Sequence, residues 1–197
     1  MQYMTHLVKD KKLSKIILEP MPPLQMHRNI PVRLIASIMS QQLSTKVAKV
    51  IYNRFIELYG GEEPQPQQVL DTPFEILRGI GLSNAKVNYV QNVARFCIEN
   101  SITDKKLKKL SNDEIIVLLT QIKGVGKWTV EMLLMFSLGR EDVFAVDDLG
   151  IQQAIVKVYK LNIENKKEIK EKMLQISSKW SPYRTYACLH LWHWKDN

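Results

Sequence analysis

Helix signals recur along almost the whole chain, and they restrict the fold more than any other feature of the sequence. Ser44 precedes a helical apolar pattern over 44–61, and Gly60 and Gly61 follow its last periodic residue. This is the usual N-cap and stop pattern of an α-helix. Further helices are expected over 31–44, 83–100, 111–122, about 127–138, 148–159, 164–177 and from Ser181 onward. Because no convincing alternation with a period of two residues is bounded by turn residues, the chain is predicted to be all-α, with nine or ten short helices.

Two further helix starts carry a capping-box pattern, in which Ser or Thr stands three residues before Glu. Thr72 pairs in this way with Glu75, and Pro73 stands between them at the predicted first helical position. Ser111 pairs with Glu114 in the same spacing. Helices are therefore predicted to begin at Pro73 and just after Ser111.

The composition favours a globular protein with a polyanionic partner. Apolar residues make up 45% of the 197 residues and charged residues 24%, which is enough apolar surface for a sizeable core. Lys and Arg number 28 against 20 Asp and Glu, giving a net charge of +8, so nucleic acid is favoured over a membrane surface. No segment has the roughly 18 uninterrupted apolar residues of a membrane span, and the first residues lack a signal-peptide core. We therefore expect a soluble, intracellular protein.

The cysteines exclude one class of metal site. Cys97 and Cys188 are the only cysteines, so a four-thiolate zinc or iron–sulfur site cannot form. Both residues lie in apolar helical patterns, which predicts buried, unpaired thiols. The lysine-rich stretches over 104–110 and 164–172 are typical of solvated helix faces rather than of a binding surface.

Two turns between predicted helices share a Gly-x-Gly pattern. Gly79 and Gly81 are followed 45 residues later by Gly124 and Gly126, and each pair follows a basic residue and precedes a helix. Glycine permits a sharp turn and the close approach of a ligand to the backbone. A simple αα-hairpin with a glycine cap is the alternative for one such pair, but two pairs in a basic chain favour helix–hairpin–helix-like turns that bind nucleic acid.

The second turn is suited to hold a phosphate group. The helix after it is predicted to begin at Lys127 or Trp128, so its first N–H groups and the positive end of its dipole face out of the turn. Lys123 and Lys127 add positive charge on either side. Such a contact would hold the DNA backbone without reading sequence. Trp128, taken alone, is more typical of a core residue than of a base-stacking surface.

An acidic pair, Asp147 and Asp148, follows the apolar run 143–146 and precedes a predicted helix. Helix capping explains one of these carboxylates well, but it explains two in succession less well. A carboxylate suits cleavage of a glycosidic bond, because an anion stabilises the oxocarbenium-like transition state and can direct a water molecule.

The stretches 38–44, 77–86, 122–151 and 181–194 together resemble the helix-hairpin-helix DNA glycosylase superfamily, and specifically its alkylpurine branch, DNA-3-methyladenine glycosylase II. The most specific part is "GVGKWT" followed by "DVFAVDDLGI". The resemblance implies one glycosylase unit over 1–197, with two helical lobes and a DNA- and base-binding cleft between them. The central lobe, which contains the hairpin, is expected over about 40–140, and the second lobe is expected from 1–39 and 141–197.

The resemblance also implies the roles of individual residues. Asp148 is the expected catalytic carboxylate, and Asp147 is expected to cap or support the helix. The other expected roles are phosphate binding by Gly124, Gly126, Lys123 and Lys127, a base pocket walled by Trp128, Met132 and Trp192, and entry into the duplex by Gln42 with Gln41 beside it. Some relatives have an aromatic residue where this chain has Met132, so whether the base is stacked from that side is left open.

The implied activity is hydrolysis of the N-glycosidic bond of a flipped-out alkylated purine in base excision repair. Relatives that also cut the DNA strand have a lysine where this chain has Trp128, so no Schiff base with the sugar is expected. The expected partner is double-stranded DNA containing a damaged base, bound by a monomer associated with intracellular DNA. No cofactor and no side-chain metal site are expected, although backbone carbonyls of the hairpin are expected to be able to hold Na⁺ or K⁺.

Two alternatives to this activity remain open. One is a glycosylase for another lesion, such as hypoxanthine, ethenoadenine or uracil, and the other is a non-catalytic DNA-binding module. Near the C-terminus, Trp180 and Trp194 are expected to pack in the core, and His190 and His193 are not expected to bind a metal. Arg184 could contact a phosphate or pair with an acid.

Overall fold

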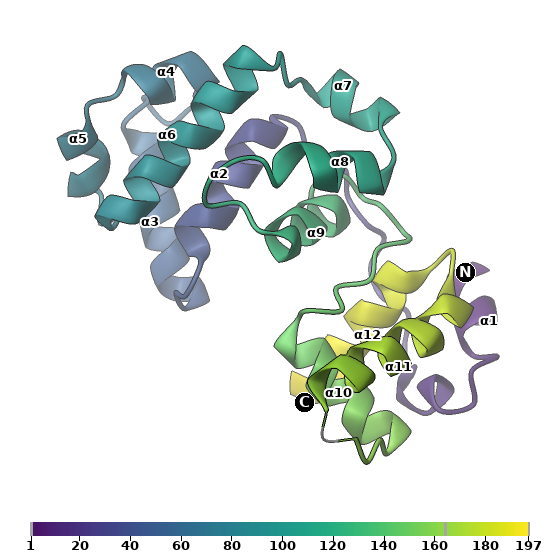
Figure 1. Ribbon diagram of the computed structural model, residues 1–197. Coiled ribbons are helices and arrows are strands. Elements are labelled where there is room, and N and C mark those ends of the chain that lie inside the picture. The colour runs from purple at the N-terminus through teal and green to yellow at the C-terminus, as the bar shows by residue number, and fades with distance from the viewer. Residues whose placement is uncertain (1, 164, 197) are drawn as a thin grey trace. The chain divides into compact units, whose positions relative to one another are not determined.

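The computed structural model describes residues 2–163 and 165–196, and its described residues form an all-α fold, as predicted (Figure 1). They contain twelve α-helices and two short 3-10 helices, and no strand. The sequence indicated nine or ten helices. The difference comes from short helices such as α1 (Gln2–Leu7), α4 (Pro66–Asp71) and α7 (Asp104–Lys109). Six residues are fewer than two helical turns, which is too short to show a helical period.

The chain divides into two compact units, of which one covers residues 26–133. Within this unit α2 packs against two helices, α3 and α6, and α6 also contacts α4 and α5 (Figure 1). Fully buried apolar side chains such as Ile35, Phe55 and Val90 form its core. Besides α4 and α7, its helices are α2 (Ile30–Ser40), α3 (Thr45–Glu57), α5 (Phe74–Gly79), α6 (Asn84–Glu99), α8 (Asn112–Leu119) and the first turns of α9 (Lys127–Phe136).

The second unit combines residues 1–25 with residues 134–197. Its central helix, α12, packs against α10 and both 3-10 helices. The indole of Trp180 is completely buried, as predicted, whereas Trp194 is 36% exposed, so the prediction that it packs in the core is wrong. Besides α1, the elements of this unit are η1 (Leu13–Ile16), α10 (Leu149–Tyr159), α11 (Lys166–Ser177), η2 (Ser178–Trp180) and α12 (Arg184–Asp196).

The unit boundaries differ from those expected. The first boundary lies between Gln25 and Met26 rather than after residue 39, because α2 packs against α3 and α6 and so belongs to unit 26–133. The second lies between Leu133 and Leu134, inside α9, rather than after residue 140. The cleft expected between the lobes remains a prediction.

Most of the predicted helix starts are confirmed. The Ser44 hydroxyl accepts a hydrogen bond from the Val47 N–H at 3.4 Å, and Ser111 and Glu114 form the predicted capping box. The capping role predicted for Thr72 is wrong. Its hydroxyl donates instead to the Gln68 carbonyl at 2.7 Å, because Thr72 ends the short helix α4 that precedes it.

Both cysteine side chains are buried and neither forms a disulfide within the described residues, which confirms the prediction for the thiols. Burial raises the pKa of the Cys97 thiol to about 12, so this thiol stays protonated and unreactive near neutral pH. Within the described part of the chain, no helix combines the length and apolar character that crossing a membrane requires.

The buried ring of His190 makes stability depend on pH. This side chain is 1% exposed, and its Nε2 atom has no hydrogen-bond partner among the described residues. Burial, together with the nearby His193, lowers the pKa of His190 from 6.5 to about 4. Between these two pH values the unfolded chain therefore binds a proton that the folded chain does not. This contribution to stability is complete above the unfolded pKa and is lost as the pH falls toward the folded pKa.

We expect His190 to reduce the free energy of unfolding by at most about 1.4 kcal/mol for each pH unit within that window. Urea unfolding of the wild type at pH 7, 6 and 5 measures the slope, and His190→Phe, which cannot be protonated, should have a smaller one. If both proteins lost stability equally between pH 7 and 5, the assignment to His190 would be wrong.

Candidate active site

The turn between α8 and α9 uses its two glycines for different purposes. Gly124 has a φ of +103°, and a Cβ atom there would lie 2.2 Å from Cγ of the Tyr89 ring, which packs against the turn from α6. Gly126 is exposed, its φ is not positive, and a Cβ atom there would meet no protein atom within 4 Å. The protein fold thus requires glycine at 124, whereas only a close-approaching ligand would require it at 126.

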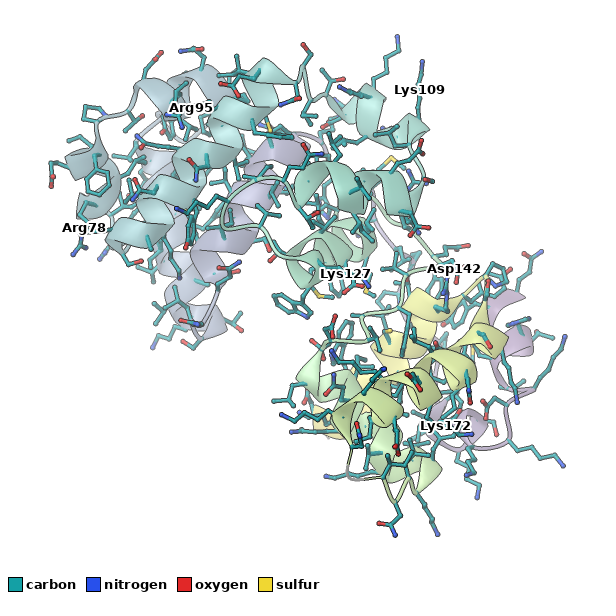
Figure 2. The ribbon with its side chains drawn as sticks, in the orientation of Figure 1. Arg78, Arg95, Lys109, Lys127, Asp142 and Lys172 are labelled. Atoms are coloured by element: carbon teal, nitrogen blue, oxygen red, sulfur yellow. The ribbon has the colours of Figure 1, made fainter. Side chains whose placement is uncertain are left out.

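Helix α9 begins at Lys127, where its start was predicted. The first N–H groups of a helix have no acceptor within the helix, so this end can hold an anion. Both Lys123 and Lys127 are exposed, and Figure 2 shows Lys127 at this end of α9. The Lys127 ammonium lies 3.5 Å from a carboxylate oxygen of the buried Glu131. This carboxylate offsets part of the Lys127 charge, so of the two lysines Lys123 would attract a phosphate more strongly.

The two Gly-x-Gly turns share a sequence pattern but not a conformation. In the first turn it is the second glycine, Gly81, that has a positive φ, of +109°, while Gly79 ends α5 without one. In the second turn it is the first glycine, Gly124. The two helix–hairpin–helix-like turns therefore differ in backbone conformation, and phosphate binding by the second turn remains a prediction.

In the loop after α2, Gln42 is exposed and Gln41 is fixed by hydrogen bonds. The exposed Gln42 has a φ of +59°, which is unusual for a residue with a side chain. The Gln41 side-chain amide donates to the Thr129 hydroxyl in the first turn of α9, at 3.2 Å. The Lys86 ammonium donates to two backbone carbonyls at the end of α2, Met39 at 2.9 Å and Gln41 at 2.7 Å. The loop is thus fixed on the side that precedes Gln42, which makes a strained residue at its tip tolerable.

In the other unit, Asp148 occupies the N-cap of α10. Its Oδ1 atom accepts two hydrogen bonds of 2.9 Å, one from the Ile151 N–H and one from the Trp192 indole N–H. The carboxylate is therefore held by the helix it begins and by α12. The expected capping role of Asp147 is wrong, because its side chain points to α11 and forms an ion pair with Lys170. Asp148 alone therefore caps the helix, and its expected catalytic role remains a prediction.

Two residues next to the Asp148–Trp192 pair were not predicted. A Cβ atom on Gly150 would lie 3.1 Å from Asp148 Oδ1 and 3.3 Å from Trp192 Nε1, so glycine allows the indole to reach the carboxylate. The Phe136 ring, 45% exposed, lies with its centroid 6.0 Å from that of Trp192. Phe136 follows Met132 by four residues and Trp128 by eight, which places all three on one face of α9. That spacing could have identified Phe136 from the sequence.

A comparison with protein families decides the family. Residues 35–179, which are more than half of the chain, match the model of the HhH-GPD superfamily base excision DNA repair proteins. The chain belongs to this superfamily. The family resemblance found in the sequence is thereby confirmed.

Named relatives of this HhH-GPD protein lie in the alkylpurine branch. The "DNA-3-methyladenine glycosylase 1" of Schizosaccharomyces pombe is 40% identical over 185 residues, which are 92% of this chain and 80% of the relative. The solved structure of the 3-methyladenine DNA glycosylase of that yeast, in complex with abasic DNA, superposes with a TM-score of 0.83 at 36% identity, covering 98% of this chain and 95% of that one. A DNA-3-methyladenine glycosidase structure from Bacillus halodurans gives 0.86 at 34% identity, covering 99% and 89%.

The residues expected to wall the base pocket of the HhH-GPD protein are divided between the units. Trp128 is 40% exposed, so it is not the core residue that its size alone would suggest, and Met132 is half-buried. Both lie in unit 26–133, whereas Trp192 lies in the other unit beside Asp148. A single pocket walled by all three remains a prediction.

The question left open for Arg184 is answered by its contacts. Its guanidinium donates to both carboxylate oxygens of Asp142, through Nε at 2.6 Å and through Nη2 at 3.0 Å. Burial alone would raise the pKa of Asp142, but the hydrogen bonds from Arg184 and Ser181 and the Arg184 charge lower it on balance. Asp142 lies in the loop between α9 and α10 (Figure 2), so the ion pair fixes this loop to α12.

Proposed function

We propose that this protein is a monofunctional DNA glycosylase, which hydrolyses the N-glycosidic bond of alkylated purines of the 3-methyladenine and 7-methylguanine type and leaves an abasic site. The observation that carries the proposal is the Asp148 carboxylate, held by the Ile151 and Trp192 N–H groups in a chain related to DNA-3-methyladenine glycosylases. A carboxylate held in this way has the fixed position that electrostatic catalysis needs.

In the proposed reaction Asp148 acts on the sugar. As the bond from C1′ to the base nitrogen breaks, both bonding electrons leave with the base, and the sugar becomes an oxocarbenium-like cation. The Asp148 anion stabilises this cation and directs a water molecule to C1′. As the water oxygen bonds to that carbon, the water passes a proton to Asp148, which then releases it to solvent. Alkylation at N3 or N7 gives the purine a positive charge, so the base departs as a neutral molecule and needs no strong general acid.

The aromatic residues favour a cationic base. An electron-rich ring attracts a cation, by about 0.5–2 kcal/mol depending on its exposure. In unit 26–133 Trp128 supplies an exposed indole. In the other unit Trp192 lies beside the carboxylate, and Phe136 lies beside Trp192. A purine must be rotated out of the duplex to reach such groups. Selectivity would then combine this attraction with the lability of the alkylated base itself.

The remaining residues hold the DNA. The exposed N–H groups at the start of α9, next to Gly126, would bind a strand phosphate together with Lys123 and, more weakly, Lys127. Gln42, at the tip of its fixed loop, would occupy the space that the rotated nucleotide leaves, with Gln41 beside it. Because glutamine is polar, it would fill the gap by hydrogen bonding.

Removal of the Lys86 ammonium should slow base release. Lys86→Met keeps the alkyl chain but loses the two hydrogen bonds to the end of α2. We expect kcat/KM for release of an alkylated purine to fall roughly tenfold, the loss usual for hydrogen bonds made by a charged group. Lys105→Met, an exposed change in the same unit, is the control. Equal activity of both variants would show that Lys86 does not position the Gln41–Gln42 loop.

Loss of the indole N–H should also impair the reaction. Trp192→Phe keeps an aromatic ring but removes the 2.9 Å hydrogen bond to Asp148. We expect the single-turnover rate to fall roughly tenfold to a hundredfold, since a hydrogen bond to a charged group contributes about 1.5–3 kcal/mol. Trp194→Phe, on the same helix, is the matched control. A wild-type rate in Trp192→Phe would mean that the indole does not orient the carboxylate.

A panel of duplexes, each with one lesion, tests the proposed specificity. The lesions are 3-methyladenine, 7-methylguanine, hypoxanthine, ethenoadenine and uracil, and the released base is measured under single-turnover conditions. Fastest release of the two methylated purines supports the proposal, whereas release of another lesion alone would replace the alkylpurine assignment. Binding to all the duplexes without release from any would favour the non-catalytic DNA-binding module.

The proposal includes three further properties. The protein is intracellular and associated with DNA, and it acts as a monomer. The turn carbonyls of Ile122 and Lys123 accept hydrogen bonds from Val125 and from the Asn92 side chain, and each carbonyl oxygen keeps a second lone pair. Oxygen ligands of this kind suit Na⁺ or K⁺, which would add positive charge where the phosphate binds.

A further inference from the structure

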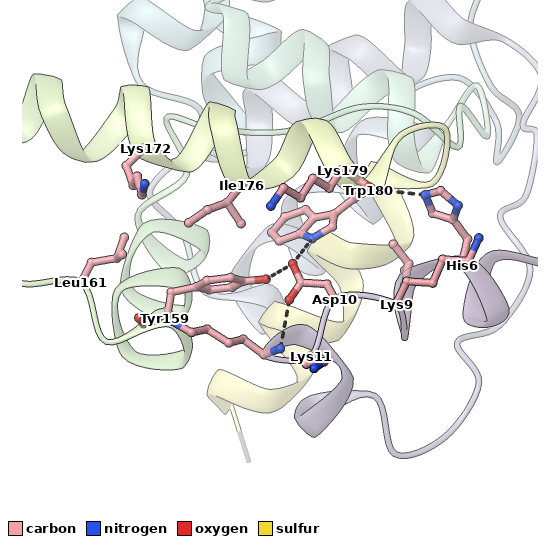
Figure 3. Close-up of a pocket in the computed structure, with 12 residues that line it drawn as sticks. His6, Lys9, Asp10, Lys11, Tyr159, Leu161, Lys172, Ile176, Lys179 and Trp180 are labelled. Carbon is pink, nitrogen blue, oxygen red and sulfur yellow. Dashed lines mark hydrogen bonds between the residues drawn. The ribbon is translucent and has the colours of Figure 1, made fainter.

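A second candidate binding site lies in the unit formed by residues 1–25 and 134–197. A cavity of about 510 Å³ opens between the N-terminal segment, the end of α10 and the α11–η2 segment (Figure 3). It reaches Tyr159, the last residue of α10, whereas Asp148 caps the first turn of that helix. Eleven residues of helix separate the two ends by about 16 Å. The cavity is therefore distinct from the carboxylate site.

The cavity carries an excess of positive charge. Five lysines line it, contributed by segments that are far apart in the sequence: Lys9, Lys11, Lys12, Lys172 and Lys179. Among the described residues, Asp10 is the only carboxylate that lines it, and Asp10 already accepts hydrogen bonds from the Tyr159 hydroxyl at 2.6 Å and the Trp180 indole at 3.2 Å. Bringing like charges together opposes folding, so such a convergence suggests an anionic ligand.

The lysines differ in what they already contact. Lys12 has a structural role, because its ammonium donates to the Tyr159 carbonyl at the end of α10, at 2.9 Å. The other four make no ion pair with any described residue. Figure 3 shows Lys172 and Lys179 on the α11–η2 side, and Lys9 and Lys11 on the N-terminal segment. Four ammonium groups from two sides are thus available to one ligand.

The floor of the cavity is apolar and rigid. The floor consists of Leu161, Ile176 and the Tyr159 ring, which is 7% exposed (Figure 3). Hydrogen bonds to Asp10 fix this ring and the indole of Trp180, which is completely buried and offers no surface of its own. A simple inorganic anion would use the lysines but not this floor. A ligand that joins a phosphate to an apolar or aromatic group would use both, and the volume lies in the range of small-molecule sites.

We propose that this cavity binds a nucleotide, with its phosphate held by the four lysines and its sugar or base on the apolar floor. The nucleotide could be free or could belong to a DNA strand, since both present the same chemistry. Of the lysines on α11, Lys172 is the one that lines the cavity. Lys166 and Lys167 do not line the cavity, and Lys170 pairs with Asp147. The stretch 164–172, which its composition assigns to a solvated surface, thus contributes Lys172 to the proposed nucleotide site.

Two indole N–H signals allow a local test. In a ¹H–¹⁵N spectrum of the full chain, the Trp180 signal reports the cavity and the Trp192 signal reports the Asp148 site, each assigned from its Phe variant. We expect titration with dATP or with lesion-free duplex DNA to shift the Trp180 signal. A shift with dATP identifies a free nucleotide as a ligand, and a shift with DNA alone identifies a nucleotide of the strand. No shift with either probe would overturn the proposal.

Charge variants complete the test. The double variant Lys172→Gln/Lys179→Gln should weaken the binding that shifts Trp180 by roughly tenfold or more, since two charge-assisted contacts are removed. The matched control, Lys166→Gln/Lys167→Gln, loses the same number of charges, both from α11, and should bind as the wild type does. Equal weakening in both variants would indicate nonspecific attraction and overturn the site, and so would pyrophosphate binding as tightly as dATP. Base release from alkylated DNA is a separate assay, so failure of this proposal would leave the glycosylase proposal standing.

Discussion

Replacing Asp148 with asparagine should slow the release of an alkylated purine by roughly a hundredfold or more, while binding to the same duplex stays unchanged. Removing one group that stabilises transition-state charge commonly has an effect of this size. Asparagine has almost the same shape, and its Oδ1 atom can still accept from the Ile151 and Trp192 N–H groups. The substitution therefore removes the negative charge with little change to the helix cap.

The measurement is a single-turnover rate of base release, with affinity for the lesion-containing duplex determined separately. Asp147→Asn is the matched control, because it removes the same charge one residue away, on a side chain that pairs with Lys170. We expect this control to act within a fewfold of the wild type. A wild-type rate in Asp148→Asn would exclude Asp148 as the catalytic group.

Replacing Gly124 with alanine should destabilise unit 26–133 by roughly 2–4 kcal/mol. A residue with a Cβ atom is strained by about 1–2 kcal/mol in a left-handed conformation, and overpacking adds about 1–3 kcal/mol. Both effects apply here, because φ is +103° and the new atom would lie 2.2 Å from the Tyr89 ring. The midpoint of urea unfolding measures the loss, and an unchanged midpoint would contradict the packing described for this turn.

Gly126→Ala, in contrast to Gly124→Ala, should affect DNA binding and leave stability nearly unchanged. Its new methyl group meets no protein atom within 4 Å, so stability should change by no more than about 0.5 kcal/mol. Affinity for DNA should nevertheless fall for all sequences alike, because the methyl group would stand where a phosphate approaches the N–H groups of α9. Full affinity in this variant would count against the phosphate role of the turn.

Local patterns in the sequence predicted the larger elements and the central carboxylate. The capping signals at Ser44 and Ser111 depend on neighbouring residues only, so they could be read directly. The expected catalytic role of Asp148 comes from a contiguous family motif and stays a prediction. Short helices such as α4 escaped prediction, because six residues carry too little periodic pattern. The chain folds Thr72 into the end of α4, which is why its predicted cap at the next helix failed.

The features that could not be predicted depend on contacts between distant segments. Lys86 reaches the end of α2, 45 residues away in sequence from Gln41, and nothing around Lys86 in the sequence indicates this contact. The different requirements for Gly124 and Gly126 arise from the Tyr89 ring on another helix. The lysines of the second cavity likewise come together only through the packing of the N-terminal segment on α10 and η2.

The most direct test of the glycosylase assignment is the product of one reaction. The wild-type protein, in excess over a duplex with a single 7-methylguanine, should release free 7-methylguanine, detected by mass spectrometry, and should leave the strand uncut until the abasic site is cleaved by alkali. An intact abasic strand is expected because Trp128 offers no amine for a Schiff base. If the protein bound this duplex but released no base above the rate without protein, the assignment would be contradicted.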